Sequence, residues 1–428
     1  MIKNSLLREN IKAGKYDAAF APIYKAEDIE AQKARYIRVS TEFDEIYGGD
    51  REVSVFSAPG RTEIGGNHTD HNHGKVLAGG VDLDAIAVAA KNDENIVRIK
   101  SEGYGMDVTE LCDLSIHDNE TSHSASLVRG VCAGFVKWGY KVGGFDAATA
   151  NDVISGSGLS SSAAFEVLVG TMLNYLYNDG KVSPVEIAQI AQYAENVYFG
   201  KPCGLMDQMA CSVGGFVQID FNDPSKPIIN KLNFDFASCG HSLCIIDSGA
   251  DHADLTDDYA AVRGEMEGVA TVFGKKVLRD VDRNEFEANI AKVRKEVNDR
   301  AVLRAKHFFN ENDRVDQQAA ALNANDFEAF KALVIESGNS SYMYNQNVYT
   351  CKYPVNQAVS VALAMCHDIL KGKGAWRVHG GGFAGTIQAF VPNDILPEFK
   401  EKICAVYGEK ACYVLNIRPV GGTMVIGE

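Results

Sequence analysis

The sequence predicts an α+β protein of two domains, and three observations support this fold class. The chain has 428 residues, whereas a single hydrophobic core stops growing at about 250 to 300 residues. Strand-like and helix-like segments both occur throughout, but without the strict alternation of a doubly wound parallel sheet. The segment FNDPSKP near residue 223 is rich in turn-forming residues and marks a boundary. We expect a helical extension over residues 1–50, a first domain over 51–222 and a second over 223–428.

The elements of the first half follow from hydrophobic periodicity. Residues 1–50 carry apolar side chains at helical spacing and predict peripheral helices. Strands are predicted in REVSVFSAPGR, GKVLAGGVDLDAIAVAA, NIVRIKSEG and FDAATANDV. Helices are predicted in SASLVRGVCAGFVKWGY, SGLSSSAAFEVLVGTMLNYLYN and SPVEIAQIAQYAENVYFG. The last of these has Ser183 as N-cap, Pro184 just inside and Gly200 past its end.

Composition and charge narrow the class of protein. Hydrophobic residues make up 46% of the chain and charged residues 23%, as in ordinary globular proteins. The formal net charge of −15 disfavours nucleic-acid and membrane partners, because both require clustered Lys and Arg. The opening segment MIKNSLLRENIKAGKYDAAF lacks the apolar core of a signal peptide, and no apolar run reaches the roughly 18 residues of a membrane span. We therefore expect a cytoplasmic protein that acts on small molecules.

The ten cysteines are spread along the chain without any C-x-x-C pair. This distribution predicts buried, reduced thiols in a reducing compartment. The sequence leaves the oligomeric state open and is compatible with a monomer.

One predicted turn concentrates polar groups. Within six residues the chain places His68, Asp70, His71, Asn72 and His73, with glycines on both sides. Three histidines and an aspartate could bind zinc, but successive strand side chains alternate faces and no second cluster completes a tetrahedral site. A sugar-binding site and a purely structural turn are the other interpretations.

The stretch SGSGLSSSAAFEV, residues 155–167, joins a predicted strand to a predicted helix through small residues. Glycines let backbone amides approach an anion, and amides at a helix N-terminus add partial positive charge. The stretch therefore predicts a phosphate cradle, with a serine-capped turn as the alternative. It is neither the Walker A pattern nor the dinucleotide fingerprint, because the lysine of the first and the third glycine of the second are missing. A second glycine run, HGGGFAGTIQAF, precedes a predicted strand and by itself fits a hairpin or bulge equally well.

Together, GRTEIGGNHTDHN, SGSGLSSSAAFEV and GGGFAG resemble the three motifs of the GHMP kinases, in the family's order and at its typical separations. AENVYFGKPCGLMDQMA and DSGADHADLTDDYAAVR are similar to two further stretches of the galactokinases within that family. The resemblance covers residues 50–428 and implies a two-domain GHMP-kinase-like fold with the active site in the cleft between domains. It also implies ATP-dependent phosphorylation of a hexose at the anomeric hydroxyl, D-galactose above all, with Mg²⁺ as cofactor.

The same resemblance implies roles for individual residues. Asp207 corresponds to the catalytic carboxylate beside the anomeric hydroxyl, and Arg61 to the cation that accompanies it. Asp207 either accepts the proton or orients the hydroxyl while Arg61 stabilises charge, and the sequence leaves both open. Ser161 and Glu195 correspond to Mg²⁺ ligands, whose oxygens suit an ion shared with ATP. The implied sugar contacts are Asn67, His68, Asp70, Gly204 and Tyr259, and the implied ATP contacts are Gly156, Ser157, Gly158, Leu159, Ser160, Ser161 and Ser162.

Three positions of the sugar motif depart from the galactokinase pattern. Asn67 stands where the family usually has a glutamate that contacts the C6 hydroxyl of the sugar, and His71 where it usually has a tyrosine. Glu63 stands where the family usually has a neutral residue. The resemblance implies that Asn67→Glu is tolerated if galactose is the substrate.

Two alternatives to a galactose kinase stay open. The missing charge at position 67 keeps a kinase for another hexose, or for a uronic acid such as galacturonate, as the nearest one. A non-catalytic sensor of galactose and ATP is the alternative of another class. Such sensors tend to lose small residues from the phosphate loop, so the intact GLSSSAA favours an enzyme.

Overall fold

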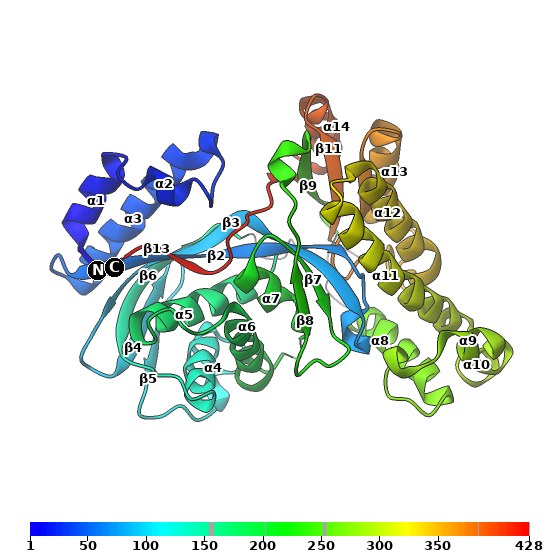
Figure 1. The fold of residues 1–428 in the computed structure, drawn as a ribbon, viewed down its shortest axis with the longest axis horizontal. Helices are drawn as coiled ribbons and strands as arrows, with labels where there is room; N and C mark the ends of the chain where they lie inside the picture. The colour runs from blue at the N-terminus through cyan, green and yellow to red at the C-terminus, as the bar shows by residue number, and fades with distance from the viewer. Residues whose placement is uncertain (154–157, 202, 251–254, 384, 428) are drawn as a thin grey trace.

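A long antiparallel pair of strands, β2 and β3, runs through the middle of the protein (Figure 1). The computed structural model describes residues 1–153, 158–201, 203–250, 255–383 and 385–427. Over these residues the strands are β1 (Ile2–Lys3), β2 (Glu52–Gly65), β3 (Lys75–Lys91), β4 (Ile96–Ser101), β5 (Met106–Glu110), β6 (Phe145–Asn151), β7 (Phe216–Asp220), β8 (Ile228–Lys231), β9 (His241–Asp247), β10 (Ala375–Val378), β11 (Thr386–Pro392), β12 (Cys412–Leu415) and β13 (Thr423–Ile426). The helices are α1 (Asn4–Lys12), α2 (Asp17–Phe20), α3 (Ile29–Tyr47), α4 (Ser124–Lys137), α5 (Ser161–Tyr177), α6 (Pro184–Tyr193), α7 (Met206–Val213), α8 (Thr256–Val272), α9 (Arg283–Ala288), α10 (Ile290–Glu296), α11 (Asp299–Asn323), α12 (Phe327–Ser340), α13 (Ala358–Leu370) and α14 (Leu396–Tyr407).

The strands form a large and a small sheet. The large sheet has the order β1-β2-β3-β6-β4-β5, with β13 beside β2, β7 beside β3 and β8 beside β7. The small sheet has the order β10-β11-β9-β12. Neighbouring strands are antiparallel, except that β4 and β6 are parallel. This mixture of mostly antiparallel sheets and segregated helices is the predicted α+β class.

The large sheet lies between two helical layers (Figure 1). Ile86 and Val88 of β3 pack with residues of α1, α2 and α3, whereas Ala85 and Ala87 pack with residues of α4, α5 and α6. Alternate residues therefore face opposite sides, as expected for a strand buried on both faces. The expected helical extension over residues 1–50 forms the first of these layers.

The helix that begins at Ser183 follows the predicted capping pattern. The Ser183 side chain accepts a hydrogen bond from the Glu186 N–H, the Glu186 side chain accepts one from the Ser183 N–H, and Pro184 occupies the first turn. The helix continues into a π-helical turn, Ala194–Phe199, and ends at Gly200, whose φ of 83° is in the left-handed region. This π-helical turn was not predicted, and it carries Glu195.

The small sheet also lies between helices. Ile246 and Ala389 face α13 and α14, whereas Ile245 and Phe390 pack with residues of α11 and α12. Two segments of the region 223–428 nevertheless join the large sheet, because β8 pairs with β7 and β13 pairs with β2. The division into domains at residue 222 therefore stays a prediction.

A buried charge cluster joins the N-terminal helices to the large sheet and to the residues before β13. The Asp84 carboxylate accepts hydrogen bonds from Arg35 at 2.6 Å, Tyr24 at 2.6 Å and Arg418 at 3.0 Å. It also accepts one from Ser57. Burial raises the pKa of Asp84, but Arg35 and Arg418 lower it more, so that the carboxyl has a pKa below its usual value.

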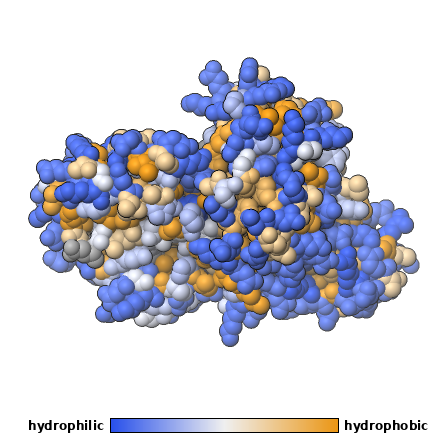
Figure 2. Space-filling view, turned by 45° about the horizontal axis from the view of Figure 1, so that its top comes forward, coloured by the Kyte–Doolittle hydropathy of each residue, from blue (hydrophilic) through white to orange (hydrophobic). Residues whose placement is uncertain are grey.

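Three further properties of the fold concern membrane-spanning helices, the surface and the cysteines. Over the described ranges, no helix is both long and apolar enough to cross a lipid bilayer. Figure 2 shows hydrophilic residues over most of one face, with hydrophobic residues gathered near its middle. All ten cysteines are free, as predicted, but not all are buried: Cys112 and Cys351 are exposed, and Cys203, Cys239 and Cys404 are partly buried.

Candidate active site

Arg61 of β2 and Asp207 in the first turn of α7 form a bidentate ion pair. The Arg61 Nε lies 2.7 Å from Asp207 Oδ1, and Nη2 lies 2.8 Å from Oδ2. Ser160 Oγ donates a further hydrogen bond to Oδ2 at 2.5 Å. Arg61 also donates to the carbonyl of Gly158. The two residues expected to be catalytic therefore contact each other, and the phosphate loop contacts both.

The Asp207 carboxylate is stabilised in its ionised form. Burial raises the pKa of Asp207, but the charge of Arg61 and the hydrogen bonds from Arg61 and Ser160 lower it further, to below its usual value. The side chain is still 32% exposed. Such a carboxylate is a weak proton acceptor, but it offers a fixed negative charge at a defined position.

The described part of the phosphate loop turns sharply into helix α5. Gly158 has a φ of 73° and Ser160 a φ of 59°, both in the left-handed region, which glycine adopts at no steric cost. Leu159 is fully buried, and its carbonyl accepts a hydrogen bond from the Arg61 N–H. No part of Leu159 is therefore exposed. The expected ATP contacts Gly156 and Ser157 lie outside the described residues.

A cavity of about 480 Å³ opens beside the start of α5. Ser161, Ser162 and Phe165 of this helix line it, together with residues from β3, β6 and the segments around Tyr104 and His123. The volume lies within the range of about 300 to 1,000 Å³ that is typical of small-molecule sites. The cavity belongs to the N-terminal half of the chain and adjoins the phosphate loop.

Glu195 lies near the same helix start. Its Oε2 accepts a hydrogen bond from Gln208 Nε2 at 2.6 Å, and its Oε1 has longer contacts with Lys201 Nζ at 3.4 Å and Ser162 Oγ at 3.5 Å. The family resemblance paired Glu195 with Ser161. The structure brings Ser162 to it instead, and the Ser161 hydroxyl accepts a hydrogen bond from Asn151 at 2.7 Å.

The donor set here suits magnesium better than zinc. In the parts of the chain that the structure describes, no group of three or more His, Cys, Asp or Glu side chains is arranged to hold a metal ion. Mg²⁺ in nucleotide sites usually takes one or two carboxylates together with substrate phosphates and water. One carboxylate, Glu195, and the hydroxyls of Ser161 and Ser162 fit that pattern.

The turn between β2 and β3 brings the expected sugar contacts together. His68 Nε2 lies 2.8 Å from the carbonyl of Gly381, and Tyr259 donates to the carbonyl of the next residue, Gly382, at 2.8 Å. Asp70 lies against Gly204, where an added Cβ would be 2.3 Å from Asp70 Oδ2. Burial and the charge of Asp207 both raise the pKa of Asp70, although hydrogen bonds from the backbone oppose them.

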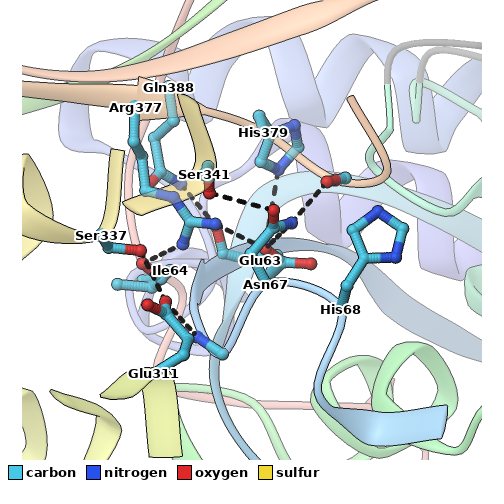
Figure 3. Close-up of polar contacts among 12 residues, drawn as sticks. Glu63, Ile64, Asn67, His68, Glu311, Ser337, Ser341, Arg377, His379 and Gln388 are labelled. Carbon is cyan, nitrogen blue, oxygen red and sulfur yellow. Dashed lines mark hydrogen bonds and ion pairs between the residues drawn. The ribbon is translucent and has the colours of Figure 1, made fainter. Parts of the chain in front are cut away.

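Asn67 differs from the other expected sugar contacts because its amide is already occupied. Its Nδ2 donates to Glu63 Oε1 at 3.0 Å and to the Gly380 carbonyl at 2.7 Å (Figure 3). Its Oδ1 accepts from Asn347 Nδ2 at 2.8 Å and from Ser341 Oγ at 3.1 Å. The side chain is fully buried. Asn67 therefore links the sugar turn to the C-terminal half of the chain.

Glu63 is the acidic partner of this link. Arg377 Nη2 donates to Glu63 Oε1 at 2.7 Å, and Arg377 Nη1 donates to the Ile64 carbonyl at 2.5 Å. Burial raises the pKa of Glu63, and Arg377 opposes this. The Nε2 of His379 accepts a hydrogen bond from the Glu63 N–H at 3.3 Å, and burial lowers the pKa of His379 well below its usual value.

Sequence reasoning missed the C-terminal residues that complete this part of the site. Arg377 lies two residues before the glycine run that begins at His379, so the neighbourhood of that run carried a signal. Ser341 and Asn347 lie in the segment SSYMYNQN, which matches none of the motifs considered. Gln208, which fixes Glu195, directly follows Asp207 and could have been inspected with it.

Comparisons with known proteins show which sequences this chain is similar to. Residues 126–215 match the family model of the GHMP kinase N-terminal domain, and residues 41–91 match the galactokinase galactose-binding signature. A galactokinase of Streptomyces coelicolor is 31% identical over 90% of this chain and 97% of its own length. A galactokinase of Glaesserella parasuis is 32% identical over 86% of this chain and 92% of its own.

Solved structures show the same fold. The Lactococcus lactis galactokinase complexed with galactose superposes with a TM-score of 0.76 at 24% identity and covers 91% of this chain and 100% of its own. The Methanococcus jannaschii mevalonate kinase superposes with a TM-score of 0.60 at 14% identity, covering 86% of this chain and 99% of its own. The two enzymes differ in substrate, so the fold by itself does not select the acceptor.

Proposed function

The chain belongs to the galactokinase family of GHMP kinases, and on that premise we propose that it transfers the γ-phosphoryl group of ATP to the anomeric hydroxyl of D-galactose. The products are ADP and α-D-galactose 1-phosphate. The observation that carries this proposal is the Arg61–Asp207 pair in direct contact with the phosphate loop, because it sets a carboxylate and a cation beside the groups that would hold the phosphates.

In this proposal Asp207 orients the anomeric hydroxyl and Arg61 stabilises the charge of the transferred group. The lowered pKa of Asp207 makes it a poor general base, but a fixed carboxylate can still accept a hydrogen bond from the attacking hydroxyl. Phosphoryl transfer needs positioning and charge stabilisation above all, since its transition state spreads negative charge over the phosphoryl oxygens.

We place the sugar over the turn between β2 and β3. The Asp70 carboxylate accepts sugar hydroxyls there, and Gly204 leaves the space beside it free of a side chain. His68 and Tyr259 form one wall of this sugar site, where they contact the carbonyls of Gly381 and Gly382. Asn67 stabilises this wall through its hydrogen bonds to Glu63 and to the Gly380 carbonyl. Because these bonds occupy its amide, it does not contact the sugar itself.

We place the nucleotide at the start of α5. The phosphates lie against the loop, including Gly156, Ser157, Gly158 and Ser160, and the nucleoside occupies the cavity lined by Ser161, Ser162 and Phe165. Glu195, Ser161 and Ser162 are the residues that would hold Mg²⁺. When bound with ATP, the ion neutralises charge on the phosphate oxygens.

The cellular setting follows from the same reasoning. The free thiols suit a reducing compartment, so we propose a cytoplasmic enzyme. Its partners are then the sugar and ATP, and neither a nucleic acid nor a membrane. A monomer is sufficient for the proposed reaction, because both halves of the site come from one chain.

An assay of ADP release separates the enzyme from a sensor. With MgATP and D-galactose, we expect saturable ADP release that stops when the metal is chelated and returns when Mg²⁺ is restored. Calorimetry that shows binding of galactose and ATP, together with no ADP release, would instead identify a sensor and contradict the proposal.

A further inference from the structure

We propose that Glu63 determines the choice of sugar, with one carboxylate oxygen that accepts a hydrogen bond from a sugar hydroxyl and excludes a uronic acid. Asn67 is its positioning residue. This inference rests on the proposed function and names the substrate class of the same site, a neutral hexose.

All hydrogen-bonding groups of the Asn67 side chain are already used within the protein. A primary amide has two N–H donors and one oxygen with two lone pairs. Both donors are used, by Glu63 and by the Gly380 carbonyl, and the oxygen accepts from Ser341 and Asn347. Because the side chain is also fully buried, it cannot reach a ligand without breaking this network.

The two carboxylate oxygens of Glu63 differ in their hydrogen bonds. Its Oε1 accepts hydrogen bonds from Arg377 and Asn67. Among the described residues none donates to Oε2, and Oε2 is not among the side-chain atoms that are sealed from solvent without a partner. The small exposed part of this side chain, 6%, therefore includes Oε2. A nearly buried carboxylate oxygen without a donor costs free energy that a ligand hydroxyl would recover.

The orientation of the Glu63 carboxylate also points to the sugar site. Figure 3 shows its carboxylate between the Arg377 guanidinium, which holds it from one side, and the His68 ring on the other. His68 lies in the sugar-binding turn and is close enough for its charge to influence the pKa of Glu63. The free oxygen thus faces the site proposed for the sugar.

The charge of Glu63 would repel the carboxylate of a uronic acid. Arg377 is bound to Glu63 and to the Ile64 carbonyl, and Arg61 is bound to Asp207 and to the Gly158 carbonyl. A uronate carboxylate beside Glu63 would meet a like charge, with both of these guanidinium groups already paired. A sugar hydroxyl donates a hydrogen bond to the same oxygen without this penalty.

The same geometry reverses the expectation for Asn67→Glu. Asn67→Glu would remove the Nδ2 donor, which lies 3.0 Å from Glu63 Oε1 and 2.7 Å from the Gly380 carbonyl, and would place a longer, negatively charged side chain beside Glu63. Two buried carboxylates in contact repel each other. The exchange of both residues, Glu63→Asn with Asn67→Glu, keeps one carboxylate and one amide and removes the repulsion.

The test compares four proteins with the parent: Glu63→Gln, Asn67→Glu, the double exchange, and the control Glu52→Gln, which changes an exposed glutamate on the same strand. Thermal unfolding is recorded for each, and galactose and galacturonate are tested by turnover and by calorimetric binding. We expect Glu63→Gln to raise the KM for galactose roughly 10-fold without changing the KM for ATP, and to narrow the gap between galactose and galacturonate. Asn67→Glu should lose activity, and the double exchange should recover a large part of it.

Several outcomes would overturn the inference. Unchanged galactose affinity and unchanged discrimination in Glu63→Gln would remove Glu63 from sugar selection, and a double exchange as poor as Asn67→Glu would remove the pairing. A parent protein that prefers galacturonate would contradict it as well. Parent protein that phosphorylates no sugar would contradict the proposed function, and the calorimetric preference of parent and Glu63→Gln would still decide the role of Glu63.

Discussion

Arg61 and Asp207 face each other through two hydrogen bonds of 2.7 and 2.8 Å, although 146 positions separate them in the sequence. Ser160 adds a third hydrogen bond to the Asp207 carboxylate at 2.5 Å. A strand of the sugar motif, the start of helix α7 and the phosphate loop therefore meet at one carboxylate. This meeting point explains how sugar and phosphate groups could be aligned by three separate segments.

Asp207→Ala should abolish most phosphoryl transfer while the fold remains. The carboxylate that positions the hydroxyl is lost, and such groups contribute about 10² to 10⁴ in rate. Asp207 is partly exposed at the start of a helix, so that its removal leaves no cavity in the core. Turnover numbers and a thermal unfolding curve check both parts. Near-normal turnover would exclude Asp207 from the mechanism.

Gly204→Ala should weaken sugar binding and leave ATP binding unchanged. The new Cβ would lie 2.3 Å from Asp70 Oδ2, so the carboxylate must rotate away from its position. We expect the KM for galactose to rise roughly 10-fold, the size of effect that follows from a lost hydrogen bond to a charged group. Gly264→Ala, at a helical position with nothing within 4 Å, is the matched control. Equal KM values for the two variants would contradict the placement of the sugar beside Asp70.

Glu311→Gln should make stability less dependent on acid pH. Glu311 of α11 is buried, accepts hydrogen bonds from the Gly66 N–H at 3.1 Å and from Ser337 at 2.6 Å, and pairs with Arg314. Burial raises its pKa, but Arg314 and the other neighbours lower it to about 2, from a usual value of 4.5. Because the folded pKa is the lower one, the stabilisation is complete above the usual pKa and is lost as pH falls from about 4.5 to about 2.

Denaturant unfolding at several pH values measures this effect. The parent should be more stable than Glu311→Gln at pH 7, and the difference should shrink toward pH 3. A difference that stays constant between pH 7 and pH 3 would show that the Glu311 carboxylate is not held ionised in the folded protein.

Asp84→Asn should destabilise the protein through the N-terminal helices. Removing one partner of a buried ion pair costs about 3 to 5 kcal/mol, and Asp84 serves both Arg35 and Arg418. Denaturant unfolding measures the loss, and hydrogen exchange should show faster exchange in α3. Asp179→Asn, which breaks an exposed ion pair with Lys181, is the control and should cost less than about 1 kcal/mol. Equal stability of the two variants would contradict the structural role of Asp84.

The sequence predicted the elements whose signal is local. The apolar run of β3, the caps of the helix at Ser183 and the small residues before α5 each reflect a short-range physical preference, and the structure has a strand, a helix and a tight turn there. The π-helical turn at Glu195 was missed because its hydrophobic spacing does not differ visibly from that of an α-helix.

Pairings between distant segments could not be predicted in the same way. The return of β13 to β2 depends on packing over the whole chain. The resemblance named Asn67 as part of the sugar motif, but its hydrogen-bond partners Ser341 and Asn347 lie 274 and 280 positions away. Only the folded structure shows that its amide is occupied and that no described residue donates to the second carboxylate oxygen of Glu63.

The most direct test of this account is to identify the product formed from MgATP across a panel of hexoses and uronic acids. Phosphorus and proton magnetic resonance of each reaction shows which sugar is phosphorylated and at which carbon. We expect α-D-galactose 1-phosphate as the main product, with little or no phosphorylation of galacturonate. Phosphate on any other carbon of galactose, or efficient phosphorylation of galacturonate in preference to galactose, would contradict it.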